Sequence, residues 1–223
     1  MSILLEVWED LVCPWCYLGR VRLTRAIAAF EHPSAVTVRS RAFELAPRLP
    51  VGAQRSVVDW LAGWGLNQTQ IEHKLSSATA AAADDGLQLS LATAIAANTF
   101  AGHRLVELGW CQGGPPLQEA VLQRLFSAHF VESMAIDDPA TLVRLGAEAG
   151  LDANGVAGFL AGEELADEVR QSQLRATELG ISSVPCFVAD RRLAVAGAQS
   201  SDTLLALLRR AYADSVGSVS VEG

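Results

Sequence analysis

Two cysteines separated by a proline and a tryptophan, Cys13-Pro14-Trp15-Cys16, stand where one local pattern gives way to another. Residues 3–8 are an apolar run interrupted by Glu6, a pattern that predicts a short buried strand. Pro14 suits the first turn of a helix, where its missing N–H removes no hydrogen bond. Apolar residues then recur at helical spacing as far as Phe30. The motif is therefore predicted at a strand-to-helix junction.

The segments around this junction complete an α/β pattern. Pro33 ends the first helix, and apolar and polar residues alternate over 35–43, as in a strand with one buried face. Near the other end, residues 184–188 and 193–195 are two apolar runs separated by a turn, which predicts a hairpin. Ser201-Asp202 then provides an N-cap for a last helix. The two ends of the chain thus have the orders βαβ and ββα.

The middle of the chain, residues 47–177, shows helical signals and no convincing strand. Gly113-Gly114-Pro115-Pro116 predicts a loop between two of these helices. The other signals are helix starts and stops, found at Asn67 with Gln70, near Gly86, at Asp138-Pro139, at Gly150, at Asp152, and at Gly180 after a helix over 163–179.

This order predicts an α/β chain with a thioredoxin-like fold and a large all-helical insertion domain. Residues 1–46 and 178–213 are predicted to form the thioredoxin-like domain, and residues 47–177 the insertion. The small and polar residues of 214–223 predict a flexible tail.

Charge and composition exclude several classes of function. The chain has 223 residues, half of them hydrophobic, and a formal net charge of −8. An acidic chain is a poor partner for nucleic acid or an anionic membrane surface, because both are bound through Lys and Arg. The N-terminus lacks the pattern of a signal peptide and no apolar run is long enough to span a bilayer, so we expect a cytoplasmic protein. The sequence leaves open whether it is a monomer or a homodimer.

The predicted position of the cysteines at a helix start favours redox chemistry. The first turn of a helix stabilises an anion, and such placement lowers a thiol pKa to roughly 3.5–7.5. We therefore expect Cys13 to be the attacking thiolate and Cys16, one turn further in, to be the resolving thiol. Pro14 and Trp15 are expected to shape the rim that contacts substrate.

A metal site is the alternative use of paired cysteines. Zinc is usually held by four Cys or His ligands, often in two paired motifs. Only Cys111 and Cys186 remain, and the four histidines are not paired. We therefore assign no metal ligand and no bound cofactor.

Val184-Pro185 is a second signal, because proline at the start of an apolar strand is excluded from a central ladder. One explanation is a cis Val184–Pro185 bond that faces the cysteines and offers the backbone of Val184 to a substrate. The alternative is an ordinary trans proline at a strand edge.

Taken together, these residues resemble the DsbA-like thioredoxin family, in particular the branch of FrnE-type oxidoreductases and 2-hydroxychromene-2-carboxylate isomerases, relatives of kappa-class glutathione transferases. The resemblance implies a helical insertion, a cis proline and an active-site groove bordered by Asn98, His103 and Arg104. For these three, local structural bonding is the alternative role. The segments that carry the resemblance are residues 10–19, 42–45, 98–100 with 103–104, 125–126 with Phe130, and 180–185.

Two positions depart from this family. Many thioredoxin-fold enzymes carry a buried acid six residues before the first cysteine, where this chain has Val7. Glu6 and Glu9 are the candidate substitutes, and we assign a general base to neither. Cys186 follows the proline directly; we interpret it as a small buried hydrophobe, with a third thiol that communicates with Cys13 and Cys16, or ligates a metal with them, as the alternative.

The sequence therefore predicts an enzyme that exchanges disulfides with protein or small-thiol substrates and uses no prosthetic group. The alternative is a glutathione-dependent isomerase or transferase, for which glutathione would be a substrate. Such relatives typically carry Ser at the first position of the motif, so the presence of both Cys13 and Cys16 favours redox chemistry. A third hypothesis is a non-enzymatic binding module on the same scaffold.

Overall fold

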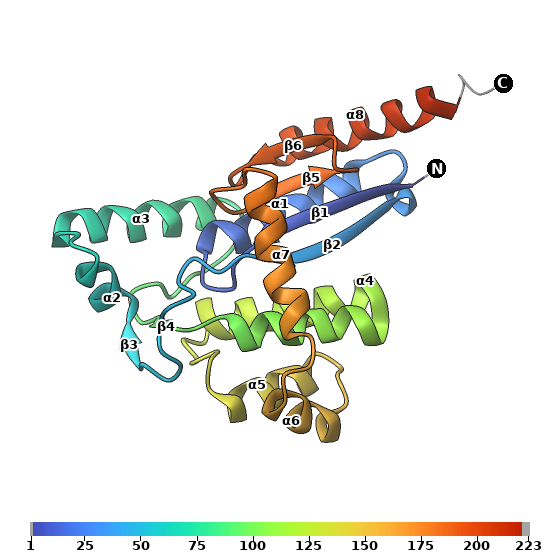
Figure 1. The fold of residues 1–223 in the computed structure, drawn as a ribbon. Coiled ribbons are helices and arrows are strands. Elements are labelled where there is room, and N and C mark those ends of the chain that lie inside the picture. Colours follow the sequence, from blue (N-terminus) through green and yellow to red (C-terminus); the bar gives the residue numbers. More distant parts are fainter. Residues whose placement is uncertain (1, 220–223) are drawn as a thin grey trace.

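The strand β1 (Ile3–Glu9) lies inside the main sheet and has a neighbour on each side. The computed structural model describes residues 2–219 of the chain. In it β1 pairs in parallel with β2 (Val36–Ala42) and antiparallel with β5 (Cys186–Ala189), and β6 (Leu193–Ala196) pairs antiparallel with β5. The sheet order β2-β1-β5-β6 confirms the predicted βαβ and ββα units (Figure 1).

The alternating side chains of β1 pack on opposite faces of the sheet. Ile3, Leu5 and Val7 lie in one core with residues of two helices, α1 (Pro14–Ala29) and α8 (Ser201–Val219). Trp8 points to the other face, where its Nε1 donates to the carbonyl of Ser172, 3.0 Å away, in α7 (Ala166–Glu178). The sheet is therefore covered on both faces, as in an α/β layer fold (Figure 1).

The predicted insertion is mostly helical. It also contains a two-residue antiparallel ladder, so the prediction that it is all-helical is wrong in this detail. Strands this short leave no periodic pattern in a sequence. The elements between β2 and α7 are β3 (Arg55–Ser56), α2 (Val57–Gly63), α3 (Gln68–Asp84), β4 (Ile95–Ala96), α4 (Phe100–Phe130), α5 (Pro139–Glu148) and α6 (Ala153–Ala161), and a 3-10 turn η1 (Pro33–Ala35) precedes β2.

The predicted loop at 113–116 is a sharp reversal inside α4. Gly114 alone leaves the helical region, with φ of 65°, a value that favours glycine. The two halves of α4 then fold back on each other, since a Cβ at Gly109 would lie 3.1 Å from the Cα of Gln118. A single residue with positive φ thus replaces the longer loop.

The helix caps follow the sequence signals, with one correction. Asn67 and Gln70 form the predicted capping box of α3. At α8 the cap is Ser200 rather than Ser201-Asp202, since the Ser200 hydroxyl accepts from the N–H of Thr203 at 3.2 Å. Of the predicted flexible tail, residues 214–219 continue α8 as helix, and residues 220–223 lie outside the described residues.

Polar contacts fix the insertion to the edge of the sheet. Gln118 of α4 accepts from the N–H of Ser40 at 2.8 Å and donates to its carbonyl at 3.4 Å. Arg39 forms a buried ion pair with Glu107 and lies over the ring of Trp110 at 4.0 Å. α7, which the predicted boundary at residue 178 leaves in the insertion, packs both on β2 of the sheet and on α4 of the insertion.

Gly19 is expected to be intolerant of a side chain. A Cβ there would lie 3.0 Å from Cγ of Pro185 and 3.1 Å from Cζ of Phe187, so Gly19→Ala should push α1 away from β5. We expect a loss of about 1–3 kcal/mol in the free energy of unfolding, measured in urea. The control is Gly158→Ala, where the described residues leave open space around the new Cβ and alanine should add about 0.5–1 kcal/mol. Equal effects of the two substitutions would contradict this packing.

Candidate active site

The cysteine turn, residues 13–16, begins α1 as the sequence predicts. Cys13 is the N-cap with extended backbone, and Pro14 occupies the first turn. The Cys13 carbonyl accepts from the N–H groups of Cys16 and Tyr17, at 3.0 and 3.3 Å. Proline at the first helical position and a carbonyl that starts the helix hold both cysteines on one turn.

The two cysteines of the turn have different surroundings. Cys13 is 5% exposed, and its Sγ donates toward the carbonyl of Val184 at 3.8 Å. Cys16 is fully buried, and its Sγ accepts from the N–H of Asp10 at 3.4 Å. Burial raises the pKa of Cys16 well above its usual value, and the neighbouring Cys13 and Glu9 raise it further. Both cysteines are therefore buried, but Cys13 lines a cavity whereas Cys16 lies behind it with no exposed surface.

Val184 and Pro185 lie opposite the cysteine turn because of strand direction. The register pairs Trp8 of β1 with Cys186 of β5, so the residues before Cys186 lie beside the residues after Trp8. The Val184–Pro185 peptide bond is cis, the first of the two alternatives that the sequence leaves open. The sequence prediction that these residues face each other is met in the contact between Cys13 and Val184.

Glu9 is the buried acid whose charge raises the pKa of the Cys16 thiol. Val7, where the family usually has an acid, packs in the core with α1 and α8. Glu9, at the end of β1, is fully buried, and its Oε2 lies 3.8 Å from the Nε of Arg20. Burial raises the pKa of the Glu9 carboxyl, against the opposing effect of Arg20. Glu6 instead pairs with Arg41 and Arg191 and is not directed to the thiols.

Asp10 organises the residues around the turn, a role that sequence reasoning missed. One carboxylate oxygen accepts from the N–H of Leu45 at 2.7 Å, and the other lies 3.3 Å from Nε2 of His103 in α4. Both Asp10 and His103 are buried. His103 thus acts on the site through Asp10, which holds the backbone N–H that reaches Cys16.

Asn98 and Arg104 make the local bonds of the structural alternative. The Asn98 amide donates to the carbonyl of Leu49 at 2.8 Å and accepts from the N–H of Phe100. Arg104 binds carbonyl oxygens at the end of α6 and lies over the ring of Phe159 at 4.8 Å. Neither residue, nor His103, is among those that line the cavity next to Cys13.

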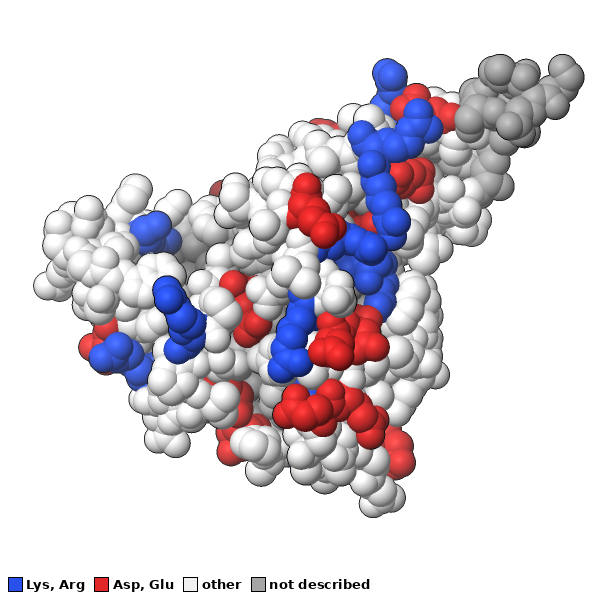
Figure 2. Space-filling model, viewed as in Figure 1, with Lys and Arg blue, Asp and Glu red and all other residues white. Residues whose placement is uncertain are grey.

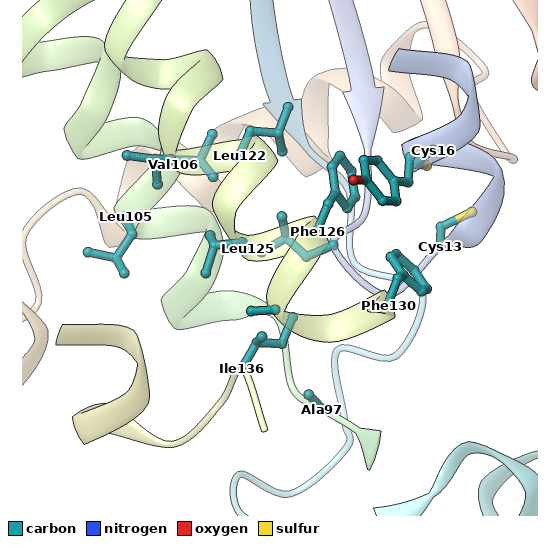
Figure 3. Packing of buried hydrophobic residues seen from close by; sticks show 14 of the residues in the cluster. Cys13, Cys16, Ala97, Leu105, Val106, Leu122, Leu125, Phe126, Phe130 and Ile136 are labelled. Atoms are coloured by element: carbon teal, nitrogen blue, oxygen red, sulfur yellow. The ribbon is translucent and has the colours of Figure 1, made fainter. Parts of the chain in front are cut away.

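A cavity of about 480 Å³ opens beside Cys13, and we name it the cysteine cavity. Phe130, which Figure 3 shows next to the cysteine turn, forms part of its wall. Sequence reasoning missed the aromatic wall of this cavity. The spacing of Trp60 and Trp64, at i and i+4, was the available signal, and in the structure their ring centroids lie 4.3 Å apart. The lining residues are Val12, Cys13, Pro14, Trp15, Leu45, Val57, Trp60, Leu61, Trp64, His73, Lys74, Leu75, Ser77, Ala78, Leu91, Ala94, His129 and Phe130.

Comparison with known proteins decides the family. A family model described as the DSBA-like thioredoxin domain matches residues 4–209. The chain belongs to the DsbA-like thioredoxin family. No curated protein sequence matches it.

Solved structures of the family are similar over nearly the whole DsbA-like chain. A probable DsbA oxidoreductase from Streptomyces coelicolor has 35% identity, with 95% of this chain and 91% of that chain covered and a TM-score of 0.88. The cytosolic disulfide reductase DsbM from Pseudomonas aeruginosa, solved with glutathione, has 24% identity, coverage of 93% and 98%, and a TM-score of 0.63. A 2-hydroxychromene-2-carboxylate isomerase has 19% identity, coverage of 99% of each chain, and a TM-score of 0.63. The last two show the shared fold.

The other two cysteines of this DsbA-like chain, Cys186 and Cys111, are not part of the cysteine turn. Cys186 is buried in β5, and burial raises its pKa, which agrees with a small buried hydrophobe. Cys111 lies in α4 and is exposed. Within residues 2–219 no group of three or more His, Cys, Asp or Glu is placed so that it could hold a metal ion.

Charged side chains of both signs lie on the face drawn in Figure 2. On the face in Figure 2, acidic and basic residues are interspersed over the sheet and α7, and the region of α2 and α3 is mostly uncharged. None of the helices described over residues 2–219 is long and apolar enough to cross a membrane.

Replacing Glu9 tests its burial. Because the folded-state pKa of Glu9 lies above the usual 4.5, the native protein keeps the Glu9 proton at pH values where the unfolded chain has already lost it. The free energy of unfolding therefore falls as pH rises from about 4.5 through the folded-state pKa. Glu9→Gln should be more stable than the parent at pH 7, by about 1.4 kcal/mol for each pH unit between the two pKa values. The gain should vanish near pH 4 in urea unfolding. Glu6→Gln, which removes two ion pairs, should lose stability at pH 7; a loss of stability in Glu9→Gln would contradict the assignment.

Proposed function

We propose that this chain is a thiol–disulfide oxidoreductase in which Cys13 and Cys16 exchange disulfides with protein or small-thiol substrates. The single observation that carries this proposal is the asymmetry of the turn: Cys13 borders a cavity and the Val184 carbonyl, and Cys16 lies fully buried behind it. An exchange site needs one sulfur that substrate can reach and a second that only the first can reach.

The reaction proceeds in two exchanges. The Cys13 thiolate attacks one sulfur of a substrate disulfide, so that a Cys13–substrate disulfide forms and the other substrate thiolate leaves and takes a proton from solvent. Cys16 then loses its proton and attacks Cys13 Sγ, which releases the second substrate thiol. The protein gives up two electrons and ends with a Cys13–Cys16 disulfide. With an oxidised protein and a dithiol substrate the same steps run in reverse.

Glu9 is the proposed proton acceptor for Cys16. The raised pKa of the Cys16 thiol makes the second step depend on removal of its proton, and the Glu9 charge is close enough to influence that pKa. A carboxyl whose own pKa is raised by burial is better matched to a thiol than an exposed one. Glu9, four residues before Cys13, would then take the role of the acid that many thioredoxin-fold enzymes carry six residues before the first cysteine, where this chain has Val7.

The proposed substrate-contacting residues are Pro14, Trp15, Val184 and Pro185. Trp15 is 36% exposed at the rim, and the backbone of Val184 faces Cys13. Asn98, His103 and Arg104 are left out of this set, because their side chains bind protein groups away from the cysteine cavity. We place the reaction in the cytoplasm, because DsbM, a cytosolic reductase, is a structural neighbour.

A glutathione-dependent isomerase or transferase is the second candidate. The fold shared with 2-hydroxychromene-2-carboxylate isomerase and the apolar cavity beside Cys13 favour it. The buried second cysteine has no use in that chemistry, which is why we rank it below disulfide exchange.

Two cysteine variants test the proposal. Cys13→Ser should lose at least about a thousandfold in the rate of insulin or small-disulfide reduction, because serine is not an effective nucleophile toward sulfur. Cys16→Ser should still react once and then accumulate a mixed disulfide at Cys13, visible by mass spectrometry. A Cys13→Ser protein that retained glutathione-dependent conversion of a ring-opened aromatic substrate would instead support the isomerase.

Glu9→Gln should slow the second exchange by about tenfold or more and leave the first unchanged, because general-base assistance contributes 10²–10⁴-fold in favourable cases. Rapid acid quenching and mass spectrometry measure the lifetime of the mixed disulfide across pH 6–9. Glu6→Gln is the matched control on the same strand and should keep the parent lifetime. Equal lifetimes in Glu9→Gln and the parent would remove Glu9 from the mechanism.

A further inference from the structure

His129 is a buried histidine that the protein itself does not satisfy. Its side chain lies in the second half of α4 and the residue is 1% exposed, yet neither ring nitrogen has a hydrogen-bond partner within residues 2–219. The nearest aromatic contact is Phe130, whose ring centroid lies 4.5 Å from that of the imidazole. An unpaired polar group of this kind costs about 1–3 kcal/mol. Some other group is therefore expected to satisfy it.

The position of His129 indicates where that group comes from. His129 lines the cysteine cavity together with Cys13 and is the most buried polar side chain of its wall. Burial lowers its pKa to about 4, against the opposing charge of Asp10, so the ring is neutral at pH 7. A neutral imidazole offers one donor and one acceptor. The complementary ligand group is therefore neutral and polar.

The rest of the wall is apolar and aromatic. Most of it consists of Trp60 and Leu61 of α2, Trp64 directly after that helix, and apolar residues of α3 such as Leu75 and Ala78. The volume of about 480 Å³ lies in the range of pockets that bind small molecules, roughly 300–1,000 Å³. Exposed Lys74 and His73 also line it.

We propose that the cysteine cavity binds the aromatic group of a low-molecular-weight disulfide, and that His129 hydrogen-bonds a neutral polar substituent on that ring. This inference rests on the proposed function and deepens it by naming the substrate class. In a protein cystine the sulfur is joined through one methylene to a polar backbone, which a largely apolar wall accommodates poorly. An aromatic thiol carries its ring directly on sulfur, so the ring can fill the cavity while the sulfur meets Cys13.

The chemical step follows the exchange already described. Cys13 attacks the sulfur that bears the bound ring, and the second aromatic thiolate leaves to solvent, where it is protonated. Cys16 then releases the bound aromatic thiol, and the protein retains a Cys13–Cys16 disulfide. One disulfide and two protein thiols become two aromatic thiols and one protein disulfide.

The test compares two disulfides that differ only in the polar group. Fully reduced protein is mixed with bis(4-hydroxyphenyl) disulfide or diphenyl disulfide, and the single-turnover rates are divided by those of N-acetylcysteine with each compound. His129→Leu should lower the normalised rate for the hydroxylated compound by about three- to tenfold, the effect of one hydrogen bond, and change the other less than twofold. His129→Gln, which keeps a donor and an acceptor, should restore part of the loss. His32→Gln, at an exposed histidine that lies outside the cavity and stacks on Tyr212, should change neither rate.

A stability measurement tests, without any catalytic assay, whether His129 is unpaired in the protein. Because leucine removes an unpaired buried polar group, His129→Leu should raise the Tm of the reduced, ligand-free protein. A lower Tm would mean that the protein already satisfies His129, and it would overturn the proposal. An equal loss of rate with both disulfides, or no loss with either, would overturn it as well.

Two further outcomes separate this inference from the proposed function. If the reduced parent protein fails to react even with 2-hydroxyethyl disulfide, the oxidoreductase assignment itself fails. If it reacts with that compound and reduces insulin at a higher normalised rate than the aromatic disulfides, the oxidoreductase stands and the substrate class named here is wrong.

Discussion

The opposite directions of the two strands that flank β1 determine where the chemistry of this fold lies. β2 runs parallel to β1 and continues its register over the whole strand, whereas β5 runs antiparallel and begins where β1 ends. The C-terminal end of β1 therefore meets the N-terminal end of β5. This single constraint brings the start of α1, with Cys13, against Val184, which lies 171 residues later in the chain. No insertion between them changes that meeting point, because the sheet pairing sets it.

Burial gives the site its chemical character. The same loss of solvation that raises the pKa of Glu9 and Cys16 lowers that of His129, so the uncharged form of each group is favoured. Asp10 is held beside these groups by its contacts with the Leu45 N–H and His103. Polar residues here fall into two kinds: those that position the turn, and those that the protein leaves unpaired.

Local sequence signals were sufficient for the sheet and the cysteine turn. Proline at 14, the alternation over 35–43 and the hairpin after Pro185 each have a short-range physical cause. The two-residue strands β3 and β4 depend on tertiary pairing, which no window of sequence reports. The cap at Ser200 is a local bond, but the adjacent Ser201-Asp202 offers an equally good sequence signal, so the sequence does not decide between them. At the site, Asp10 and His129 escaped prediction because their roles depend on contacts across more than 30 residues and on burial, neither of which residue type reveals.

The contact between Gln118 and Ser40 has a consequence beyond holding the insertion in place. β2 is the outermost strand on its side of the sheet, and the Gln118 amide accepts from and donates to the same residue of that strand. A side chain here imitates the neighbouring strand that an edge otherwise recruits from another molecule. The helical hairpin of α4 thereby protects an open β-edge from self-association, and a chain in which half the residues are hydrophobic needs such protection while it folds at cellular concentrations.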